Sequence, residues 1–192
     1  MKMLNEDEDR KFLPRLLNKK MLMGRGVEVG VLDGKHANII LENWKGKHYY
    51  GVDPFCDPSV TRGNKKIIVY GFSKGGWESV RKNAENQLNP HRYRATLLPV
   101  DSVTGSQQFL DGVLDWVYLD GRHHYEAVLE DIQVWLPKIR KGGVMAGHDY
   151  SGHEPKHAKR TCIEVKQAVD EFFGDLVETY DSGSIKSWYV EL

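Results

Sequence analysis

The sequence of 192 residues has few of the features that mark secreted, membrane or nucleic-acid-binding proteins. Its two cysteines, Cys56 and Cys162, are far apart, which excludes a disulfide framework and a paired-thiolate zinc site. No stretch approaches the roughly 18 apolar residues of a membrane span, and the N-terminal MKMLNEDEDRKF has no apolar signal core. The 27 basic and 27 acidic side chains cancel, so no overall field attracts nucleic acid or an anionic membrane. We therefore expect a soluble, cytoplasmic protein with neither as a partner.

What is present is the pattern of a single α/β domain over residues 1–192, with a leading helix within 1–22. Apolar runs of strand length alternate with amphipathic stretches of helical spacing. The predicted strands cover 26–30, 48–52, 66–70, 93–100, 114–119, 144–146, 175–180 and 187–192, and the predicted helices 36–44, 77–88, 125–139 and 163–173. The connection between the last two strands is too short for a crossover helix, so we expect those strands to pair antiparallel.

Polar residues follow the predicted strands where each one ends. They are Glu28, Gly30 and Gly34 after the first strand, then Asp53, Asp101 with Ser102, Asp120, and His148 with Asp149. Any one of these is typical of an ordinary turn. In a doubly wound sheet, however, ligands bind beyond the carboxyl ends of the strands. Five polar strand ends together predict a binding site at that edge.

The turn after the first strand indicates the kind of ligand. Gly30 and Gly34 allow a tight turn and a close approach of the backbone, but their spacing is not the G-x-G-x-x-G of dinucleotide sites. Glu28 and Asp33 add negative charge where a pyrophosphate would be repelled. Asp53 stands where an acidic residue accepts hydrogen bonds from ribose hydroxyls. We infer a nucleoside ligand without a diphosphate.

The motifs VEVGVLDG, GVDPF, LLPVDS and LDWVYLDGRHHYEAVLEDIQVWLPKIRKGGVMAGHDY resemble those of class I S-adenosylmethionine-dependent methyltransferases. Within these, the chain is similar to the small group with D-G-x-H-x-Y-E and G-H-D-Y, methyltransferase family 24, over residues 24–192. The resemblance implies a Rossmann-like, doubly wound, seven-stranded sheet with an antiparallel last strand. Helices on both of its faces would make three layers.

The resemblance also implies roles for individual residues. The first motif, which would hold the methionine part of S-adenosylmethionine, contains Glu28, Gly30, Val31 and Gly34. Asp53 matches the position at the ribose, and Asp101 and Ser102 match the motif beside the adenine. Near the transferred methyl group, the resemblance places Asp120, His123, His148 and Asp149.

Methyl transfer is an in-line displacement, so the protein must align the acceptor atom with the methyl carbon. A neutral hydroxyl acceptor must also lose its proton, and His123 or His148 could be the general base. The alternative for either histidine is a hydrogen bond that only holds a loop. Asp149 is the third candidate catalytic residue.

A divalent metal ion is a second possibility at this edge. Asp120, His148 and Asp149 offer two carboxylates and an imidazole. Related O-methyltransferases have a carboxylate or an amide where this chain has His148, which weakens a Mg²⁺ site and favours Mn²⁺ or Zn²⁺.

The acceptor that we expect is a small molecule, and a saccharide hydroxyl is the leading candidate. Residues 151–160 and 72–77 could form a lid, where Lys156, Lys159 and Arg160 would suit an anionic acceptor. Two other functions stay open: a dinucleotide-binding oxidoreductase and a non-catalytic cofactor-binding scaffold. A monomer and a homodimer fit the sequence equally well.

Overall fold

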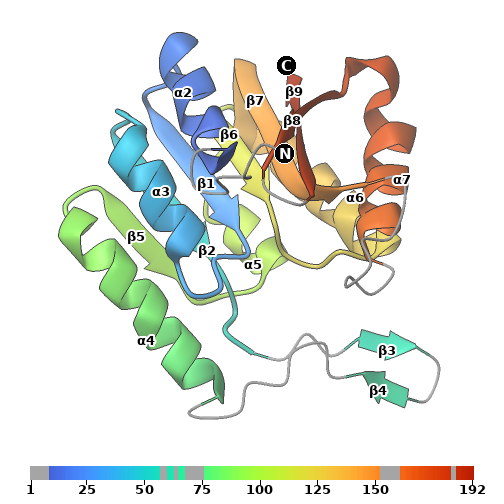
Figure 1. The fold of residues 1–192 in the computed structure, drawn as a ribbon, viewed down its shortest axis with the longest axis horizontal. Coiled ribbons are helices and arrows are strands. Elements are labelled where there is room, and N and C mark those ends of the chain that lie inside the picture. The colour runs from blue at the N-terminus through green and yellow to red at the C-terminus, as the bar shows by residue number, and fades with distance from the viewer. Residues whose placement is uncertain (1–8, 57–59, 63–64, 68–75, 152–160, 183–184) are drawn as a thin grey trace, which may run out of the picture.

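The computed structural model describes residues 9–56, 60–62, 65–67, 76–151, 161–182 and 185–192. At its centre is a seven-stranded sheet in the order β5-β2-β1-β6-β7-β9-β8 (Figure 1). The strands are β1 (Arg25–Val29), β2 (His48–Val52), β5 (Ala95–Leu98), β6 (Leu114–Leu119), β7 (Ile139–Tyr150), β8 (Glu178–Asp181) and β9 (Lys186–Glu191). The first five are parallel, whereas β9 runs antiparallel to β7 and β8. The predicted doubly wound sheet with an antiparallel last strand is confirmed.

Helices cover both faces of this sheet (Figure 1). The front face carries α2 (Phe12–Lys19), α3 (Lys35–Asn43) and α4 (Gly76–Leu88), and the rear face carries α5 (Ser102–Ser106), α6 (Tyr125–Trp135) and α7 (Thr161–Phe173). Three short 3₁₀ turns, Asn89–His91, Leu136–Lys138 and Gly174–Leu176, precede strands. A separate two-stranded sheet pairs β3 (Val60–Arg62) with β4 (Lys65–Ile67). The main sheet and its two helical faces are the three layers that we expected.

The alternation of side chains along each strand separates two hydrophobic cores. In β6, Trp116 and Tyr118 face the front core, whereas Val117 and Leu119 face the rear core. All six residues of this strand are buried because it has a neighbour on either side and helices above and below. Burial of each such side chain contributes about 1.5–3 kcal/mol to folding.

Several element boundaries differ from the sequence prediction. The helix expected to reach residue 139 ends at Trp135, because Pro137 in the next turn cannot donate a backbone hydrogen bond. The following strand begins at Ile139, five residues before the predicted start. The expected strand at 66–70 does not join the main sheet: Lys66 and Ile67 lie in β4, and 68–70 lie outside the described residues. The short helix α5 was not predicted.

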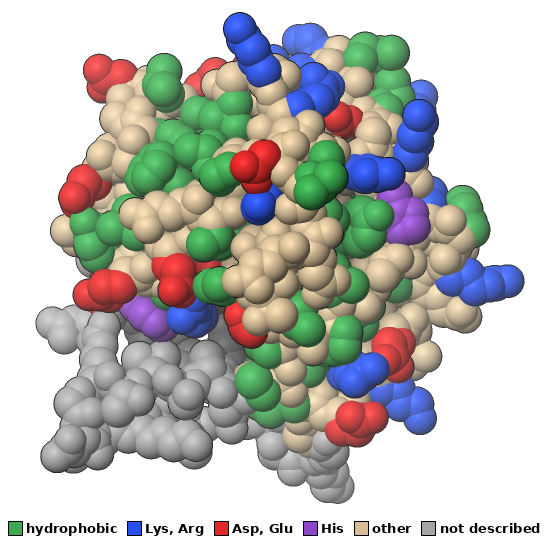
Figure 2. All heavy atoms as spheres, turned by 180° about the vertical axis from the view of Figure 1, so that it is seen from behind, with side chains coloured by type: hydrophobic (Ala, Val, Ile, Leu, Met, Phe, Trp, Pro, Cys, Tyr) green, Lys and Arg blue, Asp and Glu red, His purple; other side chains and the backbone are tan. Residues whose placement is uncertain are grey.

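The rear face in Figure 2 shows acidic and basic side chains interspersed over the surface. Among the described residues, no helix is both long and apolar enough to cross a membrane. Residues 1–8 of the expected leading segment lie outside the described residues, and its helix is α2.

Candidate active site

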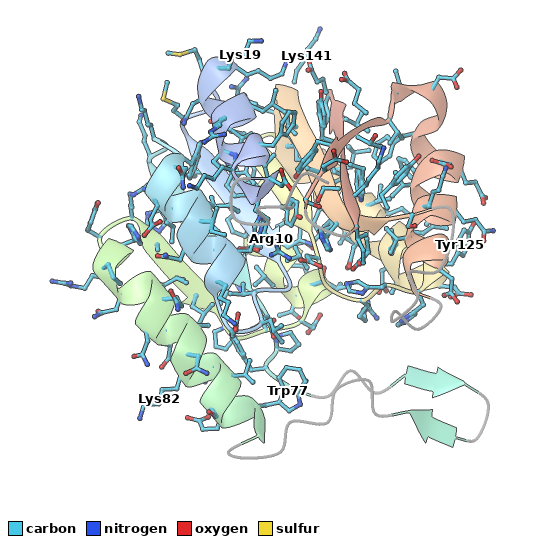
Figure 3. All side chains as sticks on the ribbon, viewed as in Figure 1. Arg10, Lys19, Trp77, Lys82, Tyr125 and Lys141 are labelled. Carbon is cyan, nitrogen blue, oxygen red and sulfur yellow. The ribbon has the colours of Figure 1, made fainter. Side chains whose placement is uncertain are left out.

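A cleft of about 740 Å³ lies at the carboxyl ends of the parallel strands. Residues from the ends of β1, β2 and β6, from the start of α5 and from α6 line it. Arg10 and Trp77, labelled in Figure 3, line the same cleft and come from the leading segment and from the start of α4. Of the predicted cofactor residues, the structure brings these to the cleft wall: Glu28, Gly30, Val31, Asp53, Asp101, Ser102, Asp120 and His123.

The first glycine turn allows two strand ends to meet. Gly30 has a φ of +88°, and a Cβ there would lie 2.1 Å from the carbonyl oxygen of Asp120. Only glycine fits this approach of β1 to β6. Gly34, by contrast, does not line the cleft: with a φ of +83° it starts α3, and a Cβ would lie 2.9 Å from the Cα of Ala84 in α4. Its role is helix packing rather than ligand approach.

Asp53 holds the two loops that border the cleft. Its Oδ2 accepts hydrogen bonds from the backbone N–H groups of Val31, at 3.0 Å, and Leu32, at 2.9 Å, and its Oδ1 accepts one from Phe55 at 2.8 Å. Leu32 and Phe55 both have positive φ, so the carboxylate secures strained turns. Burial raises the pKa of Asp53, and the three N–H groups oppose that rise. Oδ2 uses both of its lone pairs for these bonds, whereas Oδ1 keeps one lone pair that could accept from a ribose hydroxyl.

Glu28 is buried beneath the cleft and already has two partners. His36 Nδ1 lies 2.7 Å from its Oε1, and the Tyr49 hydroxyl donates to its Oε2. Burial and the Glu28 carboxylate raise the pKa of Tyr49 well above its ordinary value. His36 itself lines the cleft, although the sequence offered no reason to single it out. Glu28 therefore orients His36 as well as bordering the cleft.

Asp101 and Ser102 form the wall at α5. Asp101 caps this helix: its carboxylate accepts from the Thr104 N–H at 3.0 Å and from the Thr104 hydroxyl at 2.6 Å, which lowers its pKa. The Ser102 hydroxyl accepts a hydrogen bond of 2.9 Å from Trp135 Nε1. These bonds give the wall a defined shape.

His123 lies between two carboxylates. Its Nδ1 is 3.1 Å from Asp149 Oδ2, and its Nε2 is 3.4 Å from Asp120 Oδ1. Burial alone lowers the pKa of His123, but the two carboxylates outweigh burial and raise the pKa to about 9. At neutral pH the ring of the protein alone is therefore an imidazolium, which cannot take up a further proton.

A β-bulge directs the other two predicted catalytic residues. The pairing of β7 with β9 shifts register between Gly147 and Tyr150, and Asp149 within this bulge has a φ of +58°. Neither His148 nor Asp149 lines the large cleft; they lie behind His123. His148 Nδ1 is 3.4 Å from Asp149 Oδ1, and despite burial, which lowers it, Asp120 and Asp149 raise the pKa of His148.

Three donors meet closely enough to hold a metal ion. Asp120, His123 and Asp149 each offer one ligand atom, and these atoms all lie within 4.8 Å of one another. The predicted set had His148 in place of His123. His148 Nδ1 is farther from the Asp120 oxygen, at 3.9 Å. Two carboxylates and one imidazole are a donor set that suits Mn²⁺ or Zn²⁺ better than Mg²⁺.

Further cleft residues escaped the sequence analysis, Arg10 and Asp131 among them. No pattern distinguishes Arg10 from the other charged residues of the leading segment. Asp131 follows the helical spacing of α6 but is buried. The signal for Asp131 was a lone acid on an otherwise apolar helix face. Of the proposed lid, residues 152–160 and 72–75 lie outside the described residues, and so do Lys156, Lys159 and Arg160.

A family model described as a methyltransferase domain matches residues 27–150. The chain belongs to this methyltransferase family. The match runs from within β1 to the end of β7 and includes the four motifs quoted for the resemblance, whereas residues 151–192 of the resemblance lie outside it. The resemblance is therefore confirmed.

Solved methyltransferase structures share the fold of this protein. The O-methyltransferase TomG from Streptomyces achromogenes, in complex with SAM, superposes with a TM-score of 0.62 at 13% identity, over 96% of this chain and 79% of TomG. An O-methyltransferase from Bacillus cereus, in complex with SAH, gives 0.60 at 12% identity, over 96% and 81%. At these identities the likeness concerns the Rossmann-like methyltransferase fold.

Among curated proteins, the uncharacterized protein R132 of Acanthamoeba polyphaga mimivirus is 24% identical over 150 residues. The alignment covers 78% of this chain and 59% of the viral protein. The chain thus spans about three fifths of the length of this relative.

Proposed function

We propose that this methyltransferase transfers a methyl group from S-adenosylmethionine to a hydroxyl of a small molecule. The observation that carries the proposal is a single cleft in which the nucleoside-type residues Asp53, Asp101 and Ser102 share a wall with Asp120 and His123. TomG and the Bacillus cereus enzyme, which are similar in fold, were solved with SAM and SAH. The cleft has no glycine arrangement for a pyrophosphate, which sets a dinucleotide oxidoreductase aside.

The chain's own residues supply position and charge. Asp53 would bind the ribose, the α5 wall would border the adenine, and His36 on Glu28 would contact the methionine part. Asp120 and His123, on the same cleft wall, would then lie beside the acceptor hydroxyl. Holding the acceptor oxygen in line with the methyl carbon is the main source of rate enhancement for a displacement of this kind.

The proton of the acceptor hydroxyl needs a destination. His123 between Asp120 and Asp149 is an imidazolium in the protein alone, so a divalent ion bound by these residues fits the site as a replacement for the extra proton. When bound, such an ion would supply Lewis acidity that lowers the pKa of an acceptor hydroxyl. The Asp120 and Asp149 carboxylates and the His123 ring would hold the ion.

For the acceptor we propose a saccharide or related hydroxyl metabolite. Support comes from the family resemblance and from Arg10 and Lys35, two cations on the cleft wall that would suit an anionic sugar.

Titration calorimetry with S-adenosylhomocysteine tests the cofactor. We expect micromolar binding, about −8 kcal/mol, and none with NAD. Asp53→Ala should weaken binding at least tenfold, whereas Lys82→Ala, an exposed change on α4, should not. Titrations with EDTA and with added Mg²⁺, Mn²⁺ or Zn²⁺ show whether a metal ion strengthens the binding of S-adenosylhomocysteine. Binding of NAD but not of S-adenosylhomocysteine would overturn the proposal.

Acceptor screening with labelled S-adenosylmethionine tests the reaction. Transfer of label to saccharides by the wild type, but not by the Asp149→Ala and His123→Ala variants, supports sugar methylation. Label in proteins but not in saccharides contradicts the acceptor class. If both variants keep the protein's biological activity, the scaffold alternative is right.

A further inference from the structure

A second, much smaller cavity of about 10 Å³ lies behind the candidate catalytic residues, on the rear face of the sheet. Five elements enclose it: the loop after β6, helix α6, the bulge of β7, helix α7, and β9. Its lining includes His123, Asp131, His148 and Trp188. A cavity of roughly 10–15 Å³ can hold one water molecule.

These same four residues carry buried polar atoms that have no hydrogen-bond partner among the described residues. The atoms are Nε2 of His123, Oδ1 of Asp131, Nε2 of His148 and Nε1 of Trp188. Buried polar atoms in native proteins nearly always have a partner, and unpaired ones that share a small cavity point to a water molecule. Their convergence from four elements is the central observation.

Neighbouring groups do not satisfy these atoms. Arg122 lies 3.9 Å from Asp131 Oδ1, which is too far for a hydrogen bond, and Arg122 bonds to Glu130 instead. His123 Nε2 is 3.4 Å from Asp120 Oδ1, beyond the usual length for a nitrogen donor.

The donor and acceptor roles of the four atoms match those of one water. A water molecule accepts two hydrogen bonds and donates two. Trp188 Nε1 can only donate, and an ionised Asp131 can only accept. A histidine nitrogen can donate or accept, so Nε2 of His123 and Nε2 of His148 can fill the two remaining positions on the water.

We propose that this cavity is a binding site for one ordered water, hydrogen-bonded to Trp188, His123, His148 and Asp131. Asp131 then acts as a positioning residue, because the water connects its carboxylate to both histidine rings and fixes their orientation.

The site also links the two ends of the cleft. The carboxyl of Asp131 hydrogen-bonds to Ser102, whose hydroxyl accepts from Trp135. A chain of bonds thus runs from the α5 wall through Asp131 and the water to the histidine pair. The importance of this chain of bonds for methyl transfer rests on the proposed function. The water site itself does not depend on that function.

NMR of the uniformly ¹⁵N-labelled protein at pH 7 tests the proposal. We expect a cross-peak between the Trp188 indole proton and the water resonance. Trp116 is the internal control, because its buried Nε1 also lacks a partner and is not part of this cavity. The absence of a water cross-peak at Trp188 overturns the proposal.

Substitutions at Asp131 separate positioning from simple packing. Asp131→Asn keeps an acceptor and should retain the cross-peak, whereas Asp131→Leu should abolish it and change the ¹⁵N shifts of both histidines. If the leucine variant does not fold, Trp188→Phe, which removes the indole donor, should change the same shifts. Unchanged histidine shifts in the variant that folds contradict the proposal.

A high-resolution crystal structure gives an independent reading. Density within hydrogen-bond distance of at least three of the four atoms is expected, and an empty cavity overturns the proposal. Titrating the same wild-type sample with S-adenosylhomocysteine tests the proposed function separately from the water site. Failure to bind it refutes the proposed function and leaves the water site standing.

Discussion

At the scale of single residues, a substitution at Gly30 tests whether the close approach of β1 to β6 requires glycine. We expect Gly30→Ala to destabilise the fold by more than about 1–3 kcal/mol, the cost of a strained φ, because its Cβ would also meet the Asp120 carbonyl at 2.1 Å. Urea denaturation measures the loss. Gly112→Ala is the matched control, since its φ of +69° is strained but nothing lies within 4 Å of its Cβ. Equal losses in both variants would show that no clash occurs.

The buried carboxyl group of Asp131 should make the stability of the protein depend on pH. Burial raises the pKa of Asp131 from 3.8 to about 6. Between these values the unfolded chain releases the proton first, so this group lowers the free energy of unfolding as the pH rises, by at most about 3 kcal/mol above pH 7. Asp131→Asn lacks this loss, and its stability relative to the wild type should increase from pH 4 to 7. A constant difference in urea denaturation across that range would contradict the prediction.

At the scale of elements, the cap of α5 connects stability with the shape of the cleft wall at α5. Asp101→Ala removes the bonds to Thr104 and should cost about 0.5–2 kcal/mol, whereas Asp101→Asn, which keeps an acceptor, should cost less. The lowered pKa of Asp101 means that its charge stabilises the cap above its ordinary pKa, and that this contribution is lost as the pH falls. Thermal unfolding at pH 7 and pH 3 measures both effects. Equal losses for the two variants would exclude capping.

Substitutions in the leading helix α2 test whether this helix contributes to the stability of the fold. Leu17 is fully buried in the front core, so Leu17→Ala should cost about 2–5 kcal/mol. Lys19 is exposed on the same helix, and Lys19→Ala should have little effect. Urea denaturation of both variants tests whether α2 is part of the cooperative fold. Similar, small changes would show that it is not.

At the scale of the whole molecule, ligand binding should stabilise the folded state as a unit. S-adenosylhomocysteine at a hundredfold excess over its Kd should add about 2.7 kcal/mol to the free energy of unfolding and raise the Tm. NAD at the same concentration should not. Differential scanning fluorimetry measures both. Stabilisation by NAD alone would contradict the cofactor assignment.

The arrangement of the whole molecule followed from local patterns. Apolar runs of strand length located the seven strands of the main sheet, because helices cover both faces of the sheet and bury its strands. The polar ends of those strands identified the edge that carries the cleft. The boundaries near Pro137 and the short helix α5 escaped prediction, since a single turn of helix has no periodicity to detect.

The sequence by itself determined the family, the sheet and the residues at its binding edge, because motifs and hydrophobic spacing act over a few neighbouring residues. Only the tertiary structure decided how these side chains pair. The bulge at Asp149 moved His148 behind the cleft and left His123 between the carboxylates. It also gathered Asp131 and Trp188 around one small cavity. Such contacts join residues distant in the chain, and packing alone sets their distances.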